Sequence, residues 1–480
     1  MSGGGPTHAQ PASAAVHLVR RLTLFDSIML VVTGTIGPSI FIVPADVMRA
    51  IPIPAVALTL WVVAGGITLM AGLACAELGA MFPEAGGQYV FMREAYGGFT
   101  AFLYGWVLFT AGNSAALASM AIAVALFLGQ AVPALAADHV LWAHTVLGMH
   151  LKLEQGSLIA ASSVIVLTVI NLLSVRLAAW IHNLAALAYL VAVVVIGATG
   201  FLWGHGSWAH FQSAASSGAA SITAAGVGVA MIPLFYSYDG WEFLSWVGGE
   251  VTNPRRNLPL GLIFGIVLII LTYLLANTVY LYALTPAQLG QATVVGAAAV
   301  GTLFSSDVGR WLSLFIALIS FGGASVVVLG GARIYYSMAL DGAFFSAMTR
   351  LHPRWKTPVT SLVWQCVWVC VLIFSAHYDQ LYTCFIFMMT LTYAMTVGAV
   401  LVLRRTQPDR PRPYRCFGYP WLPIVYMLVA GAFVTSTLYT KPRESLEGLA
   451  LALLGVPLYL YWHWRKKALH RRARQVAPRA

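Results

Sequence analysis

Long apolar stretches recur along nearly the whole chain, separated by proline, glycine and charged residues. A helix of about 20 apolar residues crosses the hydrocarbon core of a bilayer. The pattern therefore predicts an all-α integral membrane protein with about twelve spans. The expected spans are 24–50, 53–81, 88–129, 156–176, 178–203, 223–249, 258–285, 310–340, 358–377, 380–404, 421–440 and 446–465.

The third apolar stretch is too long for a single crossing. We expect its start, YVFMREAYGG, to lie along the cytoplasmic surface before the helix enters the membrane. The connections at 130–155, 204–222 and 286–309 are then loops on the outer side.

The first span is interrupted near its middle, where residues 30–44 read LVVTGTIGPSIFIVP. We expect Gly34 to end one helical segment in the left-handed conformation, and Gly37 and Pro38 to begin the next. The amides of residues 39–41 would then stay free at the positive end of a helix dipole, which suits a carboxylate. The alternative is a proline-kinked span whose glycines pack against a neighbouring helix.

The sixth span, GVGVAMIPLFYSYDGWEFLSWVGGE at 226–250, is also interrupted at its centre. Asp239 and Glu242 have the spacing of a capping box, which predicts that a new half-helix starts at Asp239. The preceding half-helix should end near Tyr236 and Ser237. Its last carbonyls could accept hydrogen bonds from an ammonium group.

The first and sixth spans begin two halves of five spans each. Discontinuous helices at matching places in two halves indicate the central binding site of a transporter. Free amides in one span and free carbonyls in the other would complement the two ends of an α-amino acid. Asp239 is either a helix cap or an ionisable group that pairs with a substrate amine or carries a coupling proton.

Three other charged residues lie nearer the expected membrane interfaces. They are Glu77 near the end of the second span, Asp26 at the entry to the first, and Arg333 in the eighth. We interpret them as gate or anchor charges.

Composition supports the membrane assignment and leaves no separate soluble domain. Of the 480 residues, 59% are hydrophobic and 9% are charged, and the mean hydropathy is +0.80. The net charge of +11 is unevenly placed: with a cytoplasmic N-terminus, about 22 of the 27 lysines and arginines fall in cytoplasmic segments. Both termini are therefore expected to be cytoplasmic. We attribute the positive charge of the basic C-terminal tail to the positive-inside rule. Binding of this tail to anionic lipids is the alternative.

The expected organisation has four parts. Residues 1–21 are a disordered N-terminal tail without a secretory signal, and residues 22–404 form the transporter core. The core divides into repeats at about 22–203 and 223–404. Two further spans with their preceding cytoplasmic loop occupy 405–465, and 466–480 are a basic cytoplasmic tail.

Motifs of other functional classes are missing from the sequence. The five cysteines lie in or beside predicted spans and give no extracellular disulfide framework. There is no GxxxxGK[ST], HExxH, GxSxG or CxxC, and the histidines lack metal-ligand spacing. We therefore expect no enzyme, catalytic residue, metal, cofactor or nucleic-acid ligand. The expected partners are an amino acid and the lipid bilayer, and the sequence identifies no partner subunit.

The chain resembles amino acid permeases of the amino acid, polyamine and organocation superfamily, nearest the L-type amino acid transporter branch. Besides the two breaks, the resemblance rests on motifs that follow one another almost end to end. They are GGQYVFMREAYGGFTAFLYGW at 86–106, YDGWEFLSWVGGEVTNPRRNLPLG at 238–261, GARIYYSMALDGAFFSAMTRLHPRWKTPV at 331–359 and RPYRCFGYPWLPIVYML at 412–428.

The resemblance implies two inverted five-helix repeats plus two extra spans, with an amino acid bound at the unwound centres of spans 1 and 6. Spans 1, 2, 6 and 7 would rock against the rest. The matching residues fall into three groups. The substrate carboxylate turn corresponds to Gly37, Pro38, Ser39 and Ile40; the ammonium side to Thr35, Ser237, Tyr238, Asp239 and Gly240; and gating or coupling positions to Tyr189, Tyr236 and Trp241.

Two residues depart from the family pattern. The small-small-glycine turn of the family reads Gly37, Pro38, Ser39 here, which removes one amide and adds one β-carbon. In the stretch IHNLAALAYLVAV, Tyr189 stands where many members carry a lysine that can serve as a cation. A phenol, with an ordinary pKa near 10, supplies no positive charge. Exchange or facilitated diffusion is therefore favoured over lysine-based proton coupling.

We predict a secondary transporter of neutral or zwitterionic amino acids in a bacterial inner membrane, working by alternating access. The alternatives are a permease for polyamines or organic amines that uses Asp239, and a membrane sensor that binds an amino acid. A coupled proton or a counter-substrate is left open. A channel is disfavoured because broken helices at a closed central site serve occlusion.

Overall fold

The structure is a computed structural model that describes residues 20, 22–83, 86–146, 149–173, 175–212, 222–248, 251–353, 357–375 and 378–464. The predicted N-terminal tail, apart from Arg20, and the predicted tail 466–480 lie outside these residues.

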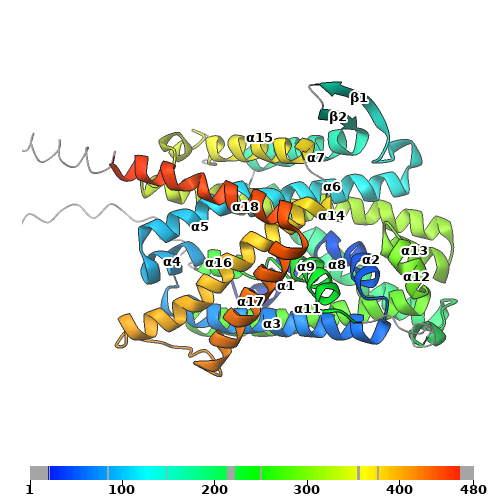
Figure 1. Ribbon diagram of the computed structural model, residues 1–480, viewed down its shortest axis with the longest axis horizontal. Coiled ribbons are helices and arrows are strands. Elements are labelled where there is room, and N and C mark those ends of the chain that lie inside the picture. The colour runs from blue at the N-terminus through cyan, green and yellow to red at the C-terminus, as the bar shows by residue number, and fades with distance from the viewer. Residues whose placement is uncertain are drawn as a thin grey trace, which may run out of the picture.

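Helices make up most of the described chain (Figure 1). In the first half they are α1 (Leu24–Thr35), the 3₁₀ helix η1 (Pro38–Phe41), α2 (Val43–Ala50), α3 (Pro54–Met81), α4 (Gln88–Tyr96), α5 (Gly98–Thr110), α6 (Asn113–Ala131), α7 (Gln155–Leu173) and α8 (Val175–Trp203). In the second half they are α9 (Ala224–Ser237), α10 (Phe243–Trp246), α11 (Pro254–Ala283), α12 (Pro286–Gln291), α13 (Val295–Leu303), α14 (Ser306–Leu340), α15 (Val359–Ser375), α16 (Tyr378–Thr406), α17 (Trp421–Thr440) and α18 (Pro442–Leu453).

Eight helices within the described residues are long and apolar enough to cross a membrane, and four shorter apolar helices accompany them. The prediction of an all-α multi-pass membrane protein is confirmed. Two of the shorter helices, α1 and α9, belong to the spans that were predicted to be broken. The long third stretch is divided at Gly97, where φ is +92°, so that α4 is a separate helix before α5.

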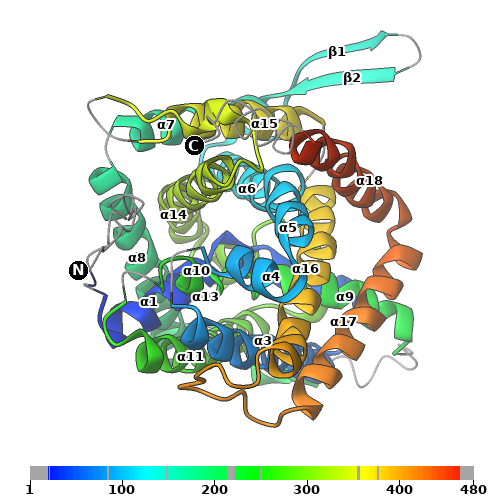
Figure 2. The same ribbon diagram turned by 90° about the vertical axis from the view of Figure 1, so that its left-hand side faces the viewer.

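All three connections predicted as outer loops contain regular structure: α12 and α13 lie within 286–309, and a short 3₁₀ helix, Trp208–Phe211, lies within 204–222. Within 130–155, strands β1 (Val140–Val146) and β2 (Met149–Glu154) form an antiparallel hairpin. The hairpin projects from the helical body next to α7 (Figures 1 and 2). Apolar and polar residues alternate only in β2, over six residues, and β1 begins with four apolar residues in a row, so the sequence pattern did not distinguish the hairpin from a loop.

The two broken spans lie inside the bundle. Viewed along the long helices, α1 and α10 lie between α14, α6 and α16 on one side and α3 and α11 on the other (Figure 2). Helix α11 packs along both α1 and α3, whereas α14 packs along both α6 and α8. Helices α17 and α18 lie outside, against α16. Irregular backbone at membrane depth is thus surrounded by protein, as the absence of water in the bilayer core requires.

Candidate functional site

The first break lies between α1 and α2. Helix α1 continues to Thr35, and Gly37 is the N-cap of η1, with Pro38 at its first position. The predicted restart at Gly37 and Pro38 therefore agrees with the structure. The predicted left-handed end at Gly34 is wrong, because this residue is helical and the cap residue Ile36 has extended backbone. The amide of Ser39 lies in the first turn of η1, where no preceding carbonyl of the helix can reach it.

The second break lies between α9, which ends at Ser237, and α10, which begins at Phe243. The predicted capping box is wrong. Asp239 does not cap a helix, because its carboxylate accepts a hydrogen bond from the hydroxyl of Tyr393 on α16 at 2.5 Å. The Glu242 carboxylate accepts one from the Gly240 amide at 3.1 Å. The partner of the Asp239 carboxylate thus lies on a distant helix and not in the adjacent turn, and sequence spacing alone cannot show such a contact.

Two glycines bring the breaks into backbone contact. A β-carbon on Gly34 would lie 2.8 Å from the carbonyl oxygen of Gly240, and one on Gly240 would lie 2.2 Å from that of Gly34. Gly240 also has φ of +102°, which L-residues rarely adopt. The reason for glycine at position 34 is therefore this close approach and not the end of a helix.

A central cavity of about 60 Å³ lies between the two breaks. Most of the predicted substrate-binding residues line it, and so do residues of four further helices. The predicted residues at its wall are Thr35, Gly37, Pro38, Ser39, Tyr236, Asp239 and Gly240. The residues not foreseen are Gly34, Leu108, Asn113, Ala116, Met120, Glu242, Phe243, Trp246, Val327, Phe385 and Met389.

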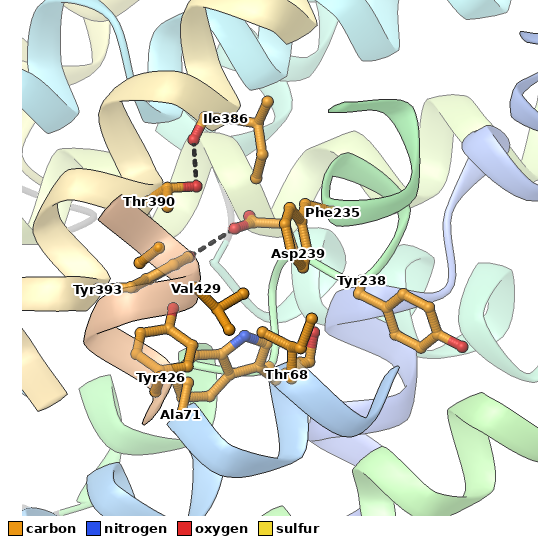
Figure 3. A pocket seen from close by; sticks show the side chains of 13 residues that line it. Thr68, Ala71, Phe235, Tyr238, Asp239, Ile386, Thr390, Tyr393, Tyr426 and Val429 are labelled. Atoms are coloured by element: carbon orange, nitrogen blue, oxygen red, sulfur yellow. Dashed lines mark hydrogen bonds between the residues drawn. The ribbon is translucent and has the colours of Figure 1, made fainter. Parts of the chain in front are cut away.

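The remaining predicted residues lie elsewhere. Ile40 is fully buried and Ser237 is buried, and neither is among the residues that line the central cavity. Tyr238 and Trp241 line a second cavity of about 30 Å³ between α3, α9, α16 and α17. Asp239 borders both cavities, and its side chain points to Tyr393 in the second one (Figure 3).

The hydroxyl of Tyr273 on α11 joins the ends of the two half-helices. It lies 2.6 Å from the carbonyl oxygen of Ser237, the last residue of α9, and 3.2 Å from that of Thr35, the last residue of α1. Its ring packs edge-on against Trp61 and Tyr238. Two of the carbonyls expected to accept an ammonium group, those of Thr35 and Ser237, are therefore already engaged by a side chain that sequence reasoning missed.

Replacing Tyr273 with phenylalanine is expected to lower the free energy of unfolding by about 1–3 kcal/mol, because buried carbonyls lose their donor. Thermal or denaturant unfolding of the purified protein measures the change. Tyr280→Phe is the matched control: Tyr280 is 1% exposed on the same helix, and no hydrogen bond of its hydroxyl is found among the described residues. Equal losses in the two variants would show that Tyr273 stabilises the fold through its ring alone.

Tyr189 lies in α8, away from the central cavity wall. Its hydroxyl is 2.6 Å from the hydroxyl of Ser320 on α14, and its ring stacks on Phe41 at 6.0 Å. Tyr189 thus links α8 to α14 and to the first break through neutral groups.

Two clusters connect other helices around the site. Near the cavity, the hydroxyls of Tyr236 and Ser119 are 2.7 Å apart, and the Tyr236 ring stacks on Tyr382 at 5.2 Å. The second cluster surrounds Glu77 on α3. Arg404 of α16 donates to both carboxylate oxygens, at 2.9 and 2.7 Å.

The loop after α16 completes the Glu77 cluster. Arg412 lies 3.5 Å from the Glu77 carboxylate, and the amide of Cys416 donates to it at 2.6 Å. Burial and then the negative charge of Glu77 raise the pKa of the Cys416 thiol to about 12, so this cysteine is uncharged at neutral pH. The cluster ties α3 to α16 and to the loop.

The described residues contain no group of three or more histidine, cysteine, aspartate or glutamate side chains that could hold a metal ion. The polar groups of the central cavity are instead backbone amides, hydroxyls and two carboxyls. Such a site can bind a small polar molecule by both its positive and its negative end.

Comparison with known proteins identifies relatives over nearly the full length. The profile of a family described as "Amino acid permease" matches residues 22–452. The human large neutral amino acids transporter small subunit 2 is 28% identical over 477 residues, which cover 97% of this chain and 86% of that protein. The serine/threonine exchanger SteT of Bacillus subtilis (strain 168) is 28% identical, and the match covers 94% of this chain and 98% of that protein. The human cystine/glutamate transporter is 26% identical, and the match covers 95% of this chain and 88% of that protein.

Proposed function

The chain belongs to the amino acid permease family, and we propose that it exchanges small neutral amino acids across a bacterial inner membrane by alternating access. The relatives described above are transporters or exchangers by name, and none is named as an enzyme. Both termini are cytoplasmic in this proposal, because that topology places most basic residues inside.

The observation that carries the proposal is the central cavity between two broken helices. In this proposal the first-turn amides of η1, including that of Ser39, bind the substrate carboxylate. Thr35 and Asp239 border the same cavity, and in this proposal their side-chain oxygens accept from an ammonium group. Since a water molecule needs about 10–15 Å³, a cavity of about 60 Å³ holds about four waters, which favours a small side chain.

Alternating access in this proposal is a motion of α1, α3, α9 and α11 against the remaining helices. Tyr273 keeps the ends of α1 and α9 together during the motion. Glu77 and Arg404 connect a moving helix to a static one, so their contact closes one side of the site. Tyr189 supplies no positive charge, which favours exchange over lysine-based coupling.

Uptake into proteoliposomes tests the proposal. A panel of labelled L-alanine, L-serine, L-leucine, L-glutamate, L-lysine and putrescine is presented to vesicles with and without internal unlabelled substrate. We expect saturable uptake of alanine or serine that internal substrate accelerates. Uptake of putrescine in place of any amino acid would instead identify an amine permease, and saturable binding without flux would identify a sensor.

A further inference from the structure

Asp239 and Glu242, two residues of the sixth span that carry carboxyl groups, both border the central cavity. Glu242 is 2% exposed, and Asp239 is half-buried and borders both cavities. None of the ion pairs formed by the described residues includes either carboxyl. The hydrogen-bond donors of both carboxyls are neutral groups: the Tyr393 hydroxyl for Asp239, and the Tyr393 hydroxyl with the backbone amides of Gly240 and Glu242 for Glu242.

The groups that face the pair from the surrounding helices add no positive charge. The titratable side chains that act on the pair, within the part of the chain that the structure describes, are three phenols and a thiol. They are Tyr104 of α5, Tyr393 of α16, Tyr426 of α17 and Cys75 of α3. Two ionised carboxylates in a poorly solvated site repel each other, so the closed site requires a compensating cation or a proton.

A separate observation indicates what cation the cavity accepts. The hydroxyl oxygen of Thr35, a residue that is 5% exposed and lines the cavity, has no hydrogen-bond partner among the described residues. The Ser237 carbonyl is engaged by Tyr273. The oxygen-bearing side chains at the cavity wall thus include the Thr35 hydroxyl and the carboxyls of Asp239 and Glu242. This set fits a primary ammonium group, which has three donors.

We propose that the Asp239–Glu242 pair binds one proton when the carrier closes empty, and that the ammonium group of the substrate displaces this proton. The proposal rests on the proposed transport of amino acids. The proton comes from water, forms an O–H bond on one of the two carboxyls, and returns to water when the ammonium group takes its place.

The mode of transport then decides whether protons move. When substrate crosses in both directions, the ammonium group compensates the pair each time and no proton is carried. When the carrier returns empty after net uptake, it carries one proton the opposite way. Net transport is therefore proton-substrate antiport through span 6, whereas exchange is independent of the proton gradient.

Proteoliposomes without internal substrate test this directly. With labelled L-serine, or the panel amino acid of greatest exchange flux, an interior one pH unit more acidic should accelerate net uptake. Accumulation should approach about tenfold at one-to-one stoichiometry, since each pH unit is a factor of ten. Exchange measured in vesicles loaded with unlabelled substrate should respond little to the same gradient.

Variants locate the proton. Glu242→Gln removes one carboxyl, and the acceleration of net uptake by an acidic interior should disappear in this variant. Asp307→Asn, which changes a carboxyl whose side chain is 77% exposed on α14, should keep the acceleration. If Glu242→Gln does not fold, the wild-type gradient experiment still tests the proposal, because net uptake that is independent of the gradient would overturn it.

Three results would overturn the proposal: acceleration of net uptake by an acidic exterior, net uptake that is equal at every gradient, and an unchanged gradient response in Glu242→Gln. Each of them leaves amino acid exchange intact and so leaves the proposed function standing. Loss of exchange for every amino acid of the panel would instead contradict the proposed function itself.

Discussion

Replacing Gly240 with alanine is expected to abolish transport. The added β-carbon would lie 2.2 Å from the carbonyl oxygen of Gly34, and the backbone would have to keep φ at +102°. Neither neighbour is a flexible side chain, so the two breaks must separate. We expect a loss of at least about 3 kcal/mol in the free energy of unfolding. Exchange flux per folded protein should fall more than about tenfold.

Gly431→Ala is the matched control for this experiment. Gly431 lies on the exposed side of α17, and a β-carbon at this position would have no atom within 4 Å. Alanine in an exposed helical position favours the helix by about 1 kcal/mol relative to glycine. The exchange flux and the free energy of unfolding of Gly431→Ala should therefore equal or exceed those of the wild type. Wild-type flux in Gly240→Ala would show that the breaks do not need their backbone contact.

Replacing Glu77 with glutamine is expected to have the second largest effect. The Glu77 side chain is 1% exposed, and the change leaves Arg404 and the 8% exposed Arg412 without their carboxylate. Removing one partner of a buried ion pair costs about 3–5 kcal/mol, because the remaining charge stays buried and unpaired. We expect a loss of about 3 kcal/mol, since Arg404 is partly exposed. Thermal unfolding measures the loss.

Glu447→Gln provides the comparison with an exposed pair. Glu447 and its partner Arg443 on α18 have side-chain exposures of 55% and 76%. Exposed ion pairs contribute about 0–1 kcal/mol, so this variant should unfold almost as the wild type does. Similar losses of unfolding free energy in the two variants would show that the Glu77 cluster stabilises the protein no more than an exposed ion pair does.

The fold was largely predictable because the bilayer constrains the sequence. Apolar length identified the long helices. Glycine and proline located the first break and the polar centre of the sixth span located the second, and the structure places these breaks at 36–37 and 238–242. The hairpin at 140–154 was not predicted, since a short strand pattern outside the membrane is under no such constraint.

The site was only partly predictable, for a physical reason. Residues next to the breaks could be named because the breaks themselves are visible in the sequence. Asn113 and Met389 line the same cavity but lie within continuous apolar helices, where no local signal marks the face that meets the cavity. Tyr273 was missed for the same reason. Asp239 was assigned a local cap, whereas its partner Tyr393 is 154 residues away in the chain.

Occupation of the central cavity by an amino acid is tested most directly by equilibrium binding to the purified protein. Ala116 lines the cavity from α6, so Ala116→Phe should fill it, whereas Ala116→Ser should leave room for substrate. Thermal unfolding first establishes that all three proteins are folded. The labelled amino acid should then bind the wild type and Ala116→Ser saturably at one site and should not bind Ala116→Phe. Binding of equal affinity to Ala116→Phe would contradict a substrate site between the two breaks.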